Sequence, residues 1–379
     1  MSSCPHKTVS ELRKFGRIFY NLDADVRLGA GCWIPTRAED IRAVLNDAAL
    51  FSSRGMAGFA ALLGEHWDLI PVEKDPPEHS AYRAVLNPLF GPTRMRAIEA
   101  RIRVRARELL GAAGASSQVE FISAFGTPFP VSIFLELMGL PLARLEEFVE
   151  WTDALLRGAT IPDRVAAAQA IAAYLRAEID ERKKHPADDV ITYLSTAEVF
   201  GRRFNEDELI GSAMLIFLGG IDTVASSLGF HFLHLARNPA LQAQLRANPE
   251  QIPVAVEELL RAYAIVGPHR RVTRDVEFAG VKMCEGDWVL CVTALANLDP
   301  EETMEPLEFR MDRGGARHLT FSYGPHRCLG AHLARRELIV ALETWLLEAP
   351  AFEVASEADV RIHGGSLLGV DHLPLRWLA

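Results

Sequence analysis

Residues 321–330 read FSYGPHRCLG, and a strong helical pattern follows at once in AHLARRELIVALETWLLE. A thiolate needs positive potential and hydrogen-bond donors to stay deprotonated and to ligate a metal. A glycine-rich loop that opens onto a helix N-terminus supplies both, through its backbone N–H groups and the positive end of the helix dipole. The sequence therefore makes Cys328 a candidate ligand of a metal-containing group.

Other residues of this loop have matching properties. Gly324 and Gly330 allow the backbone to approach a flat, bulky group closely, because neither carries a Cβ. His326 and Arg327 can face an anionic group such as a cofactor carboxylate. Two other interpretations of Cys328 stay open: a buried structural cysteine, and a catalytic nucleophile with His326 as its base, although no third member of a triad is evident.

The most apolar stretch of the chain, AMLIFLGGIDTVASSLGF, covers residues 213–230. It is almost long enough to span a bilayer, but Asp222 and Thr223 sit inside it, so we expect a buried central helix instead. The Gly219–Gly220 pair costs up to about 1 kcal/mol per glycine relative to alanine, so a kink or a nearby ligand has to compensate. A hydroxyl bonded to its i−4 carbonyl and an acid at a polar interface are the alternative interpretation of Thr223 and Asp222.

Two shorter motifs indicate a function only in combination with the segments described above. EELLR places Glu258 and Arg261 on one helix face, which alone is a commonplace ion pair. KDPPEHSAYR, residues 74–83, begins a helix at its prolines and puts His79 and Arg83 on one face. Such a pair suits an anionic partner, although a solvated helix end is the simpler alternative.

Composition limits the class of protein. The 379 residues carry a net charge of −10 and no basic tract, which disfavours nucleic acid as a partner. Five cysteines without a CxxC pair favour reduced thiols in the cytoplasm over disulfides or a zinc ribbon. The N-terminus has no apolar leader region, and we expect no membrane anchor.

The apolar periodicity predicts a mainly α chain with a smaller β region. Alternation and turns at Gly280 and Glu285–Gly286 predict strands within residues 271–294. Neither an internal repeat nor a linker divides the chain, which favours one domain over residues 1–379. Helices are expected over residues 94–112, 131–138, 165–183, 206–237 and 330–348.

These motifs, in this order, resemble the cytochrome P450 family. FSYGPHRCLG fits the pattern F-x-x-G-x-[HR]-x-C-x-G, GGIDT fits [AG]-G-x-[DE]-T, and EELLR contains E-x-x-R. A wider similarity to the bacterial camphor hydroxylase branch runs from about residue 65 to the end of the chain. The resemblance implies the P450 fold, a single large helical domain with haem between the long central helix and the cysteine-loop helix.

The resemblance also implies haem b as the cofactor, with Cys328 as the axial ligand of its iron. His326 and Arg270 would bond propionates, and Arg271 remains an alternative to Arg270. The full set of cofactor-binding residues implied is His79, Arg83, Arg270, Phe321, Gly324, His326, Cys328 and Gly330.

Further roles follow from the same resemblance. Asp222 and Thr223 would direct protons to bound O₂, and Gly219 would open the helix beside it. Glu258 and Arg261 would form a structural ion pair joined by Arg313.

The substrate pocket departs from the camphor hydroxylase branch, because Trp67 stands where that branch has a tyrosine hydroxyl that grips a ketone. An indole N–H can donate one hydrogen bond but cannot accept one. Core packing is about as good an interpretation as substrate contact for each of the other residues. The pocket residues implied are Trp67, Leu69, Val72, Phe217, Val266, Leu367 and Leu368.

The function that the resemblance implies is hydroxylation of a small apolar substrate, such as a terpenoid, a norisoprenoid or a small aromatic, by O₂ and two electrons. The chain contains no flavin or ferredoxin segment, so a 2Fe-2S ferredoxin and its reductase are the expected donors, with Arg83 as a docking residue. We expect a cytoplasmic monomer. Two alternatives stay open: a peroxide-driven haem-thiolate enzyme, and a haem- or ligand-binding protein without turnover.

Overall fold

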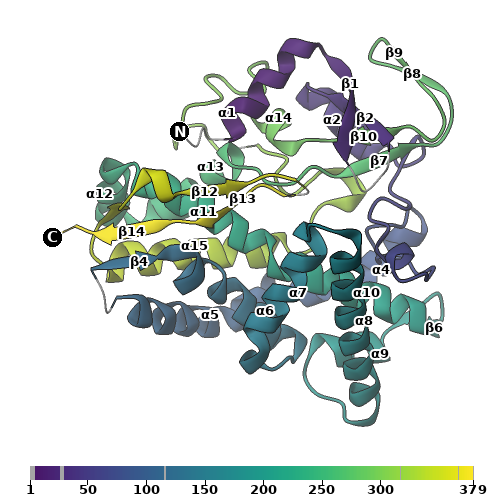
Figure 1. Ribbon diagram of the computed structural model, residues 1–379, viewed down its shortest axis with the longest axis horizontal. Helices are drawn as coiled ribbons and strands as arrows, with labels where there is room; N and C mark the ends of the chain where they lie inside the picture. The colour runs from purple at the N-terminus through teal and green to yellow at the C-terminus, as the bar shows by residue number, and fades with distance from the viewer. Residues whose placement is uncertain (1–4, 26–29, 115–116, 316, 366, 379) are drawn as a thin grey trace.

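The computed structural model describes residues 5–25, 30–114, 117–315, 317–365 and 367–378, and helices dominate it (Figure 1). The helices are α1 Pro5–Ser10, α2 Ala38–Asn46, α3 Phe59–Leu62, α4 Glu78–Leu86, α5 Pro92–Ala113, α6 Pro128–Met138, α7 Leu145–Arg157, α8 Ile161–Lys184, α9 Val190–Thr196, α10 Glu206–Ile221, α11 Thr223–Ala236, α12 Pro239–Ala247, α13 Ile252–Ala262, α14 Thr293–Asn297 and α15 Ala331–Glu348.

The strands form one larger sheet and several small ones. The larger sheet has the order β1-β2-β10-β7-β3, in which β10 runs parallel to β2 and antiparallel to β7. The smaller sheets are β11-β14-β4, β12-β13, β5-β6 and β8-β9. The bounds are β1 Ile18–Asp25, β2 Ala30–Pro35, β3 Phe51–Ser52, β4 Gln118–Glu120, β5 Glu198–Val199, β6 Arg202–Arg203, β7 His269–Val272, β8 Val276–Phe278, β9 Val281–Met283, β10 Trp288–Leu290, β11 Phe352–Val354, β12 Arg361–His363, β13 Gly369–His372 and β14 Pro374–Trp377.

The prediction of a mainly α chain with a smaller β region is confirmed. Four strands, β7 to β10, occupy the β-rich stretch expected within residues 271–294. Each expected helix is present, most of them a few residues longer at one end. The sheet region and the helices bury separate apolar clusters, one around α2 and β10 and a larger one around α10, α11 and α15.

One expectation needs correction, because the helix expected over residues 206–237 is two helices. α10 begins with a reciprocal cap, in which the Asn205 side chain accepts from Glu208 N–H and the Glu208 carboxylate accepts from Asn205 N–H. It ends at Ile221, and α11 starts at Thr223. A Cβ on Gly220 would lie 2.0 Å from the Phe134 ring, so this glycine is required by packing against α6.

The two helices together cross the centre of the molecule (Figure 1). Residues 206–236 are long and apolar enough to cross a membrane by length and composition alone, since their most apolar 18-residue window has a mean hydropathy of 1.7. However, 78% of their most apolar window is buried inside the fold. This segment is therefore the buried central helix that the sequence predicts.

Candidate active site

The cysteine loop is held by its own backbone. Cys328 N–H donates to the Phe321 carbonyl at 2.8 Å, which closes residues 321–328 into a compact turn. Gly324 has φ +68°, and a Cβ there would lie 2.9 Å from the Leu45 carbonyl oxygen at the end of α2. Gly324 is thus needed for both its backbone conformation and its close contact with α2.

Cys328 precedes the N-terminus of α15, and the Gly330 backbone N–H donates to its sulfur. The sulfur reaches solvent, yet the protein that surrounds it raises the pKa of the thiol by desolvation. The Gly330 bond and the charges of Arg83, Arg335 and Arg327 act in the opposite direction, because they favour the thiolate. This donor set suits a thiolate that ligates a metal, in line with the interpretation of the loop from sequence.

Beside the loop, four cationic or titratable side chains converge from three elements. The rings of His79 on α4 and His326 lie 4.1 Å apart, centroid to centroid. Burial, together with the charges of Arg270, His79 and Arg83, lowers the pKa of His326 to about 2. Burial and the Arg83 charge likewise lower the pKa of His79 to about 4. The charge of Asp75 opposes the lowering of the pKa at His79 and Arg270, but it does not outweigh burial at either group.

Two members of this cluster have unused bonding capacity. His79 is 2% exposed, and neither of its ring nitrogens has a hydrogen-bond partner among the described residues. Arg270 is 1% exposed, and in the described ranges no carboxylate forms an ion pair with it. Its Nη1 donates to its neighbour's carbonyl, and burial lowers its pKa. Buried polar groups in this state fit a bound group that carries carboxylates, as haem does.

The structure separates the two arginines that the sequence left as alternatives. β7 turns Arg270 inward and Arg271 outward, where Arg271 is exposed and lies over the Trp288 ring at 5.9 Å. Only Arg270 lies with His326 and His79.

The remaining loop residues have protein partners. Arg83 Nη1 donates to the Arg327 carbonyl at 2.6 Å, and its Nε donates to Asn87 Oδ1. Arg83 thus ties α4 to the cysteine loop. The Arg335 guanidinium lies 4.3 Å from the centroid of the Phe321 ring, and His326 Nε2 lies 3.1 Å from Ser53 Oγ.

At the junction of α10 and α11, Thr223 Oγ1 donates to the Gly219 carbonyl at 2.8 Å. This is the i−4 bond weighed in the sequence as an alternative, and it leaves the hydroxyl oxygen able to accept a further bond. Gly219 is exposed within an otherwise buried helix, and a Cβ there would meet no atom within 4 Å. An open space therefore borders the helix at Gly219.

Asp222 accepts two bonds from Arg157, the last residue of α7, at 2.9 and 3.1 Å. Burial lowers the pKa of Arg157, but the bonds and charge of Asp222 outweigh it and raise it overall. Sequence reasoning missed Arg157. A buried acid in an apolar helix signals that a cation must approach it, but nothing in the sequence singles one out among 40 lysines and arginines.

The expected ion pair on α13 is accompanied by Arg313. Glu258 accepts from Arg261 at 2.7 and 2.8 Å and from Arg313 Nε at 3.0 Å. Arg261 also donates to the carbonyls of Asn297, Pro306 and Glu308. Every strong donor and acceptor here is paired.

The candidate pocket residues fall into two groups. Phe217 is 0% exposed and packs against Phe134 and Phe148. Trp67 and Leu69 are almost fully buried. The side chains that are only partly buried are Val72, Val266, Leu367 and Leu368, and Val266 and Leu367 form a β-bridge.

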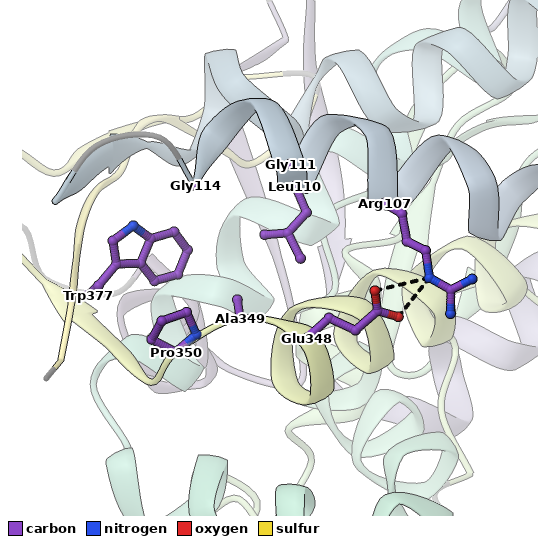
Figure 2. Close-up of a pocket in the computed structure, with 8 residues that line it drawn as sticks. All are labelled: Arg107, Leu110, Gly111, Gly114, Glu348, Ala349, Pro350 and Trp377. Carbon is purple, nitrogen blue, oxygen red and sulfur yellow. Dashed lines mark hydrogen bonds and ion pairs between the residues drawn. The ribbon is translucent and has the colours of Figure 1, made fainter.

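A separate surface cavity of about 430 Å³ lies at the far end of α15 from Cys328 (Figure 2). Arg107 and Glu348 pair at its edge, and Trp377 lines its other side. Since α15 rises about 1.5 Å per residue, some 30 Å separates this cavity from the cysteine. It shares no residue with the candidate site.

Comparisons of this chain with known protein families and relatives agree with the site described above. The cytochrome P450 family model matches residues 153–364. A probable cytochrome P450 127A1 of Sinorhizobium fredii is 41% identical over 374 residues, which cover 98% of this chain and 90% of the relative. The erythromycin C-12 hydroxylase of Saccharopolyspora erythraea is 35% identical over 361 residues, covering 91% and 89%.

Solved structures give the same result. The crystal structure of CYP101J2 matches with a TM-score of 0.88 and 31% identity, covering all of this chain and 94% of that one. CYP101C1 matches with a TM-score of 0.88 and 33% identity, covering 99% and 94%. The chain therefore belongs to the cytochrome P450 family of haem b monooxygenases.

Proposed function

We propose that this chain hydroxylates a small apolar substrate with O₂ and two electrons from a ferredoxin system, and that Cys328 is the thiolate ligand of its haem. The observation that carries the proposal is the sulfur of Cys328 at the start of α15, which accepts from the Gly330 N–H. Haem, when bound, supplies the activation of O₂ and the oxidation of a C–H bond.

In this proposal the cationic cluster holds the polar edge of the haem. The ring nitrogens of buried His79 lack hydrogen-bond partners among the described residues, Arg270 is a buried guanidinium without an ion pair in that part of the chain, and His326 lies against His79. Two propionates would neutralise the cluster. Phe321, Gly324 and Gly330 shape the loop, and Arg83 braces it through the Arg327 carbonyl.

At the junction of α10 and α11, Thr223 and Asp222 would take part in proton delivery. The Thr223 hydroxyl donates to the Gly219 carbonyl, so its oxygen can accept a bond from water or from a reacting group. Asp222 is held by Arg157 and can exchange protons with solvent only when that pair opens. Gly219 leaves room beside the hydroxyl.

The substrate class follows from the apolar candidate pocket. Val72, Val266, Leu367 and Leu368 offer no polar side-chain atom, which favours a terpenoid, a norisoprenoid or a small aromatic. The relatives' names include a pentalenic acid synthase, a mycinamicin IV hydroxylase/epoxidase and an erythromycin C-12 hydroxylase, so members of the family differ in their substrates. We further propose a cytoplasmic monomer of one domain, residues 1–379, which receives electrons from a 2Fe-2S ferredoxin near Arg83.

The test is the optical spectrum of the dithionite-reduced protein with carbon monoxide. We expect a strongly red-shifted Soret band in the native protein, and a band at the position typical of a nitrogen ligand in Cys328→His. A native spectrum without the red shift, in folded and haem-loaded protein, would remove Cys328 from its role. Turnover with peroxide but not with reduced ferredoxin would favour the peroxide-driven alternative.

A further inference from the structure

Residues 57–73 form a long connection that contains α3 and the candidate pocket residues Trp67, Leu69 and Val72. Connections of this length are usually mobile unless something fixes them. In this chain two carboxylates fix it from opposite sides. Neither has a role in the site described above.

The inner carboxylate is Glu73, which is 3% exposed. Its Oε1 accepts from the backbone N–H groups of Ala57 at 2.9 Å and Gly58 at 3.3 Å, and its Oε2 accepts from Leu69 N–H at 2.8 Å. A buried carboxylate is stable only when it is fully hydrogen-bonded, so this arrangement draws both ends of the connection together. Glu73 thereby fixes the main chain that carries Leu69.

The outer carboxylate is Glu65, which accepts the indole N–H of Trp67 and pairs with both terminal nitrogens of Arg176 on α8. The Arg176 bonds, and then the Trp67 bond, lower the pKa of Glu65. The single side-chain donor of Trp67 is therefore already used by Glu65.

The same connection crosses the central helix. Ile70 N–H donates to the Gly211 carbonyl on α10 at 3.4 Å, and a Cβ on Gly211 would lie 2.0 Å from the Asp68 carbonyl oxygen. This crossing lies about two turns before Gly219 on the same helix. The connection is thus packed against both α10 and α8.

We infer that Glu73 and Glu65 are positioning residues that preform this wall of the pocket, and that Glu65 withholds the Trp67 N–H from the substrate. The wall therefore selects substrates by shape and gives no advantage to a ketone. This inference rests on the proposed function for its pocket, but the Glu65–Trp67 bond is a property of the chain alone.

The experiment follows the indole N–H signals of ¹⁵N-tryptophan protein by NMR, in the diamagnetic ferrous carbon monoxide form. Trp67→Phe identifies the Trp67 signal among those of the six tryptophans. Glu65→Ala should shift it and speed its hydrogen exchange by about tenfold, the factor equivalent to ~1.4 kcal/mol. Glu65→Gln should largely preserve it, because an amide oxygen still accepts.

The matched control is Glu357→Ala, which removes another two-bond pair on the surface, with Arg237, and should leave the Trp67 signal unchanged. A second part of the experiment compares the binding of camphor and camphane. The two molecules have nearly the same shape, and camphane has a methylene group where camphor has its ketone. Trp67→Phe should change the dissociation constants of both by the same factor, measured from the shift in the Soret band.

Two results would overturn the inference: an unchanged Trp67 signal in Glu65→Ala, or a loss of camphor affinity in Trp67→Phe at least about fivefold greater than that of camphane. The proposed function fails separately, through the absence of the red-shifted Soret band. In that case the Glu65→Ala signal still tests the bond, since it needs no ligand.

Discussion

Two buried acid–arginine pairs in this molecule have similar chemistry and different surroundings. Glu258 and Arg261 stand on one helix, 2% and 1% exposed, and Arg261 also bonds three carbonyls. Asp222 and Arg157 come from different elements, and the arginine side chain is 28% exposed. Arg157 also pairs with the half-exposed Asp153.

The difference lies in what happens when each pair opens. If Arg261 left Glu258, an acid and a guanidinium would be stranded inside the protein, which costs several kcal/mol. If Arg157 left Asp222, it would keep Asp153 as a partner near solvent. The first pair therefore suits a permanent anchor, and the second suits a contact that opens and closes as α7 moves. The predictions below test this distinction.

The largest effect is expected for Glu258→Ala, which leaves Arg261 buried without its acid. We expect a loss of about 3–5 kcal/mol in the free energy of unfolding, measured with urea. Glu257→Ala on the same helix is the matched control. Glu257 is 31% exposed and pairs with Arg335, so it should cost no more than about 1 kcal/mol. Equal losses would contradict the anchor role.

Arg157→Met should have a smaller effect on stability, about 1–3 kcal/mol, because Asp222 is left without its partner but the pair lies closer to solvent than Glu258 and Arg261 do. The folded protein should still be recovered. Asp153→Asn, which removes only the exposed partner, should change the free energy of unfolding by less than about 0.5 kcal/mol. If Arg157→Met is as damaging as Glu258→Ala, the second pair is an anchor too.

Thr223→Ala tests the chemistry next to the openable pair. Electron consumption should continue while product per electron falls about tenfold and peroxide rises, since the hydroxyl oxygen that would hold water for proton delivery beside the site is lost. Thr223→Ser should restore most of the product, because it keeps the hydroxyl. Ser227→Ala removes the same type of back-bond one turn later and should have no effect on coupling. Retained coupling in Thr223→Ala would exclude its proposed role.

The smallest effect concerns pH and Glu257. Burial raises the pKa of Glu257, but bonds from His318 and Arg335 outweigh it and lower the pKa to about 2. The folded pKa lies below the unfolded one, so this stabilisation is present above about pH 4.5 and is lost as the pH falls toward 2. Discounted for solvent screening, it amounts to about 1 kcal/mol. Glu257→Gln should flatten the dependence of unfolding free energy on pH by that amount in this range.

Much of the architecture could be predicted because its signals are local. The loop around Cys328 and the helix after it are contiguous in sequence, and so are Glu258 and Arg261. The alternation within residues 271–294 gave the strands around Arg270. The sequence predicts Phe217 in the pocket wall as readily as in the core, because apolar residues line both, and only the structure shows that it packs against Phe134 and Phe148.

What could not be predicted depends on contacts between distant segments. Arg157 and Asp222 are 65 residues apart, and Arg176 and Glu65 are 111 apart. An arginine near the end of a helix is common, so its sequence gives no sign of which acid it meets. The break after Ile221 was missed for a related reason: the glycines permit a kink, but only the Phe134 ring requires one of them.

The three backbone bonds of Glu73 have a consequence for the evolvability of this enzyme. Since its carboxylate recognises main-chain N–H groups, it does not require particular side chains at residues 57 and 69, whereas the φ of +63° at residue 58 favours glycine there. Natural drift or directed evolution can therefore diversify the neighbouring positions while the connection keeps its course. A library that randomises position 69 and retains Glu73 is a direct route to enzymes with altered selectivity and intact folding.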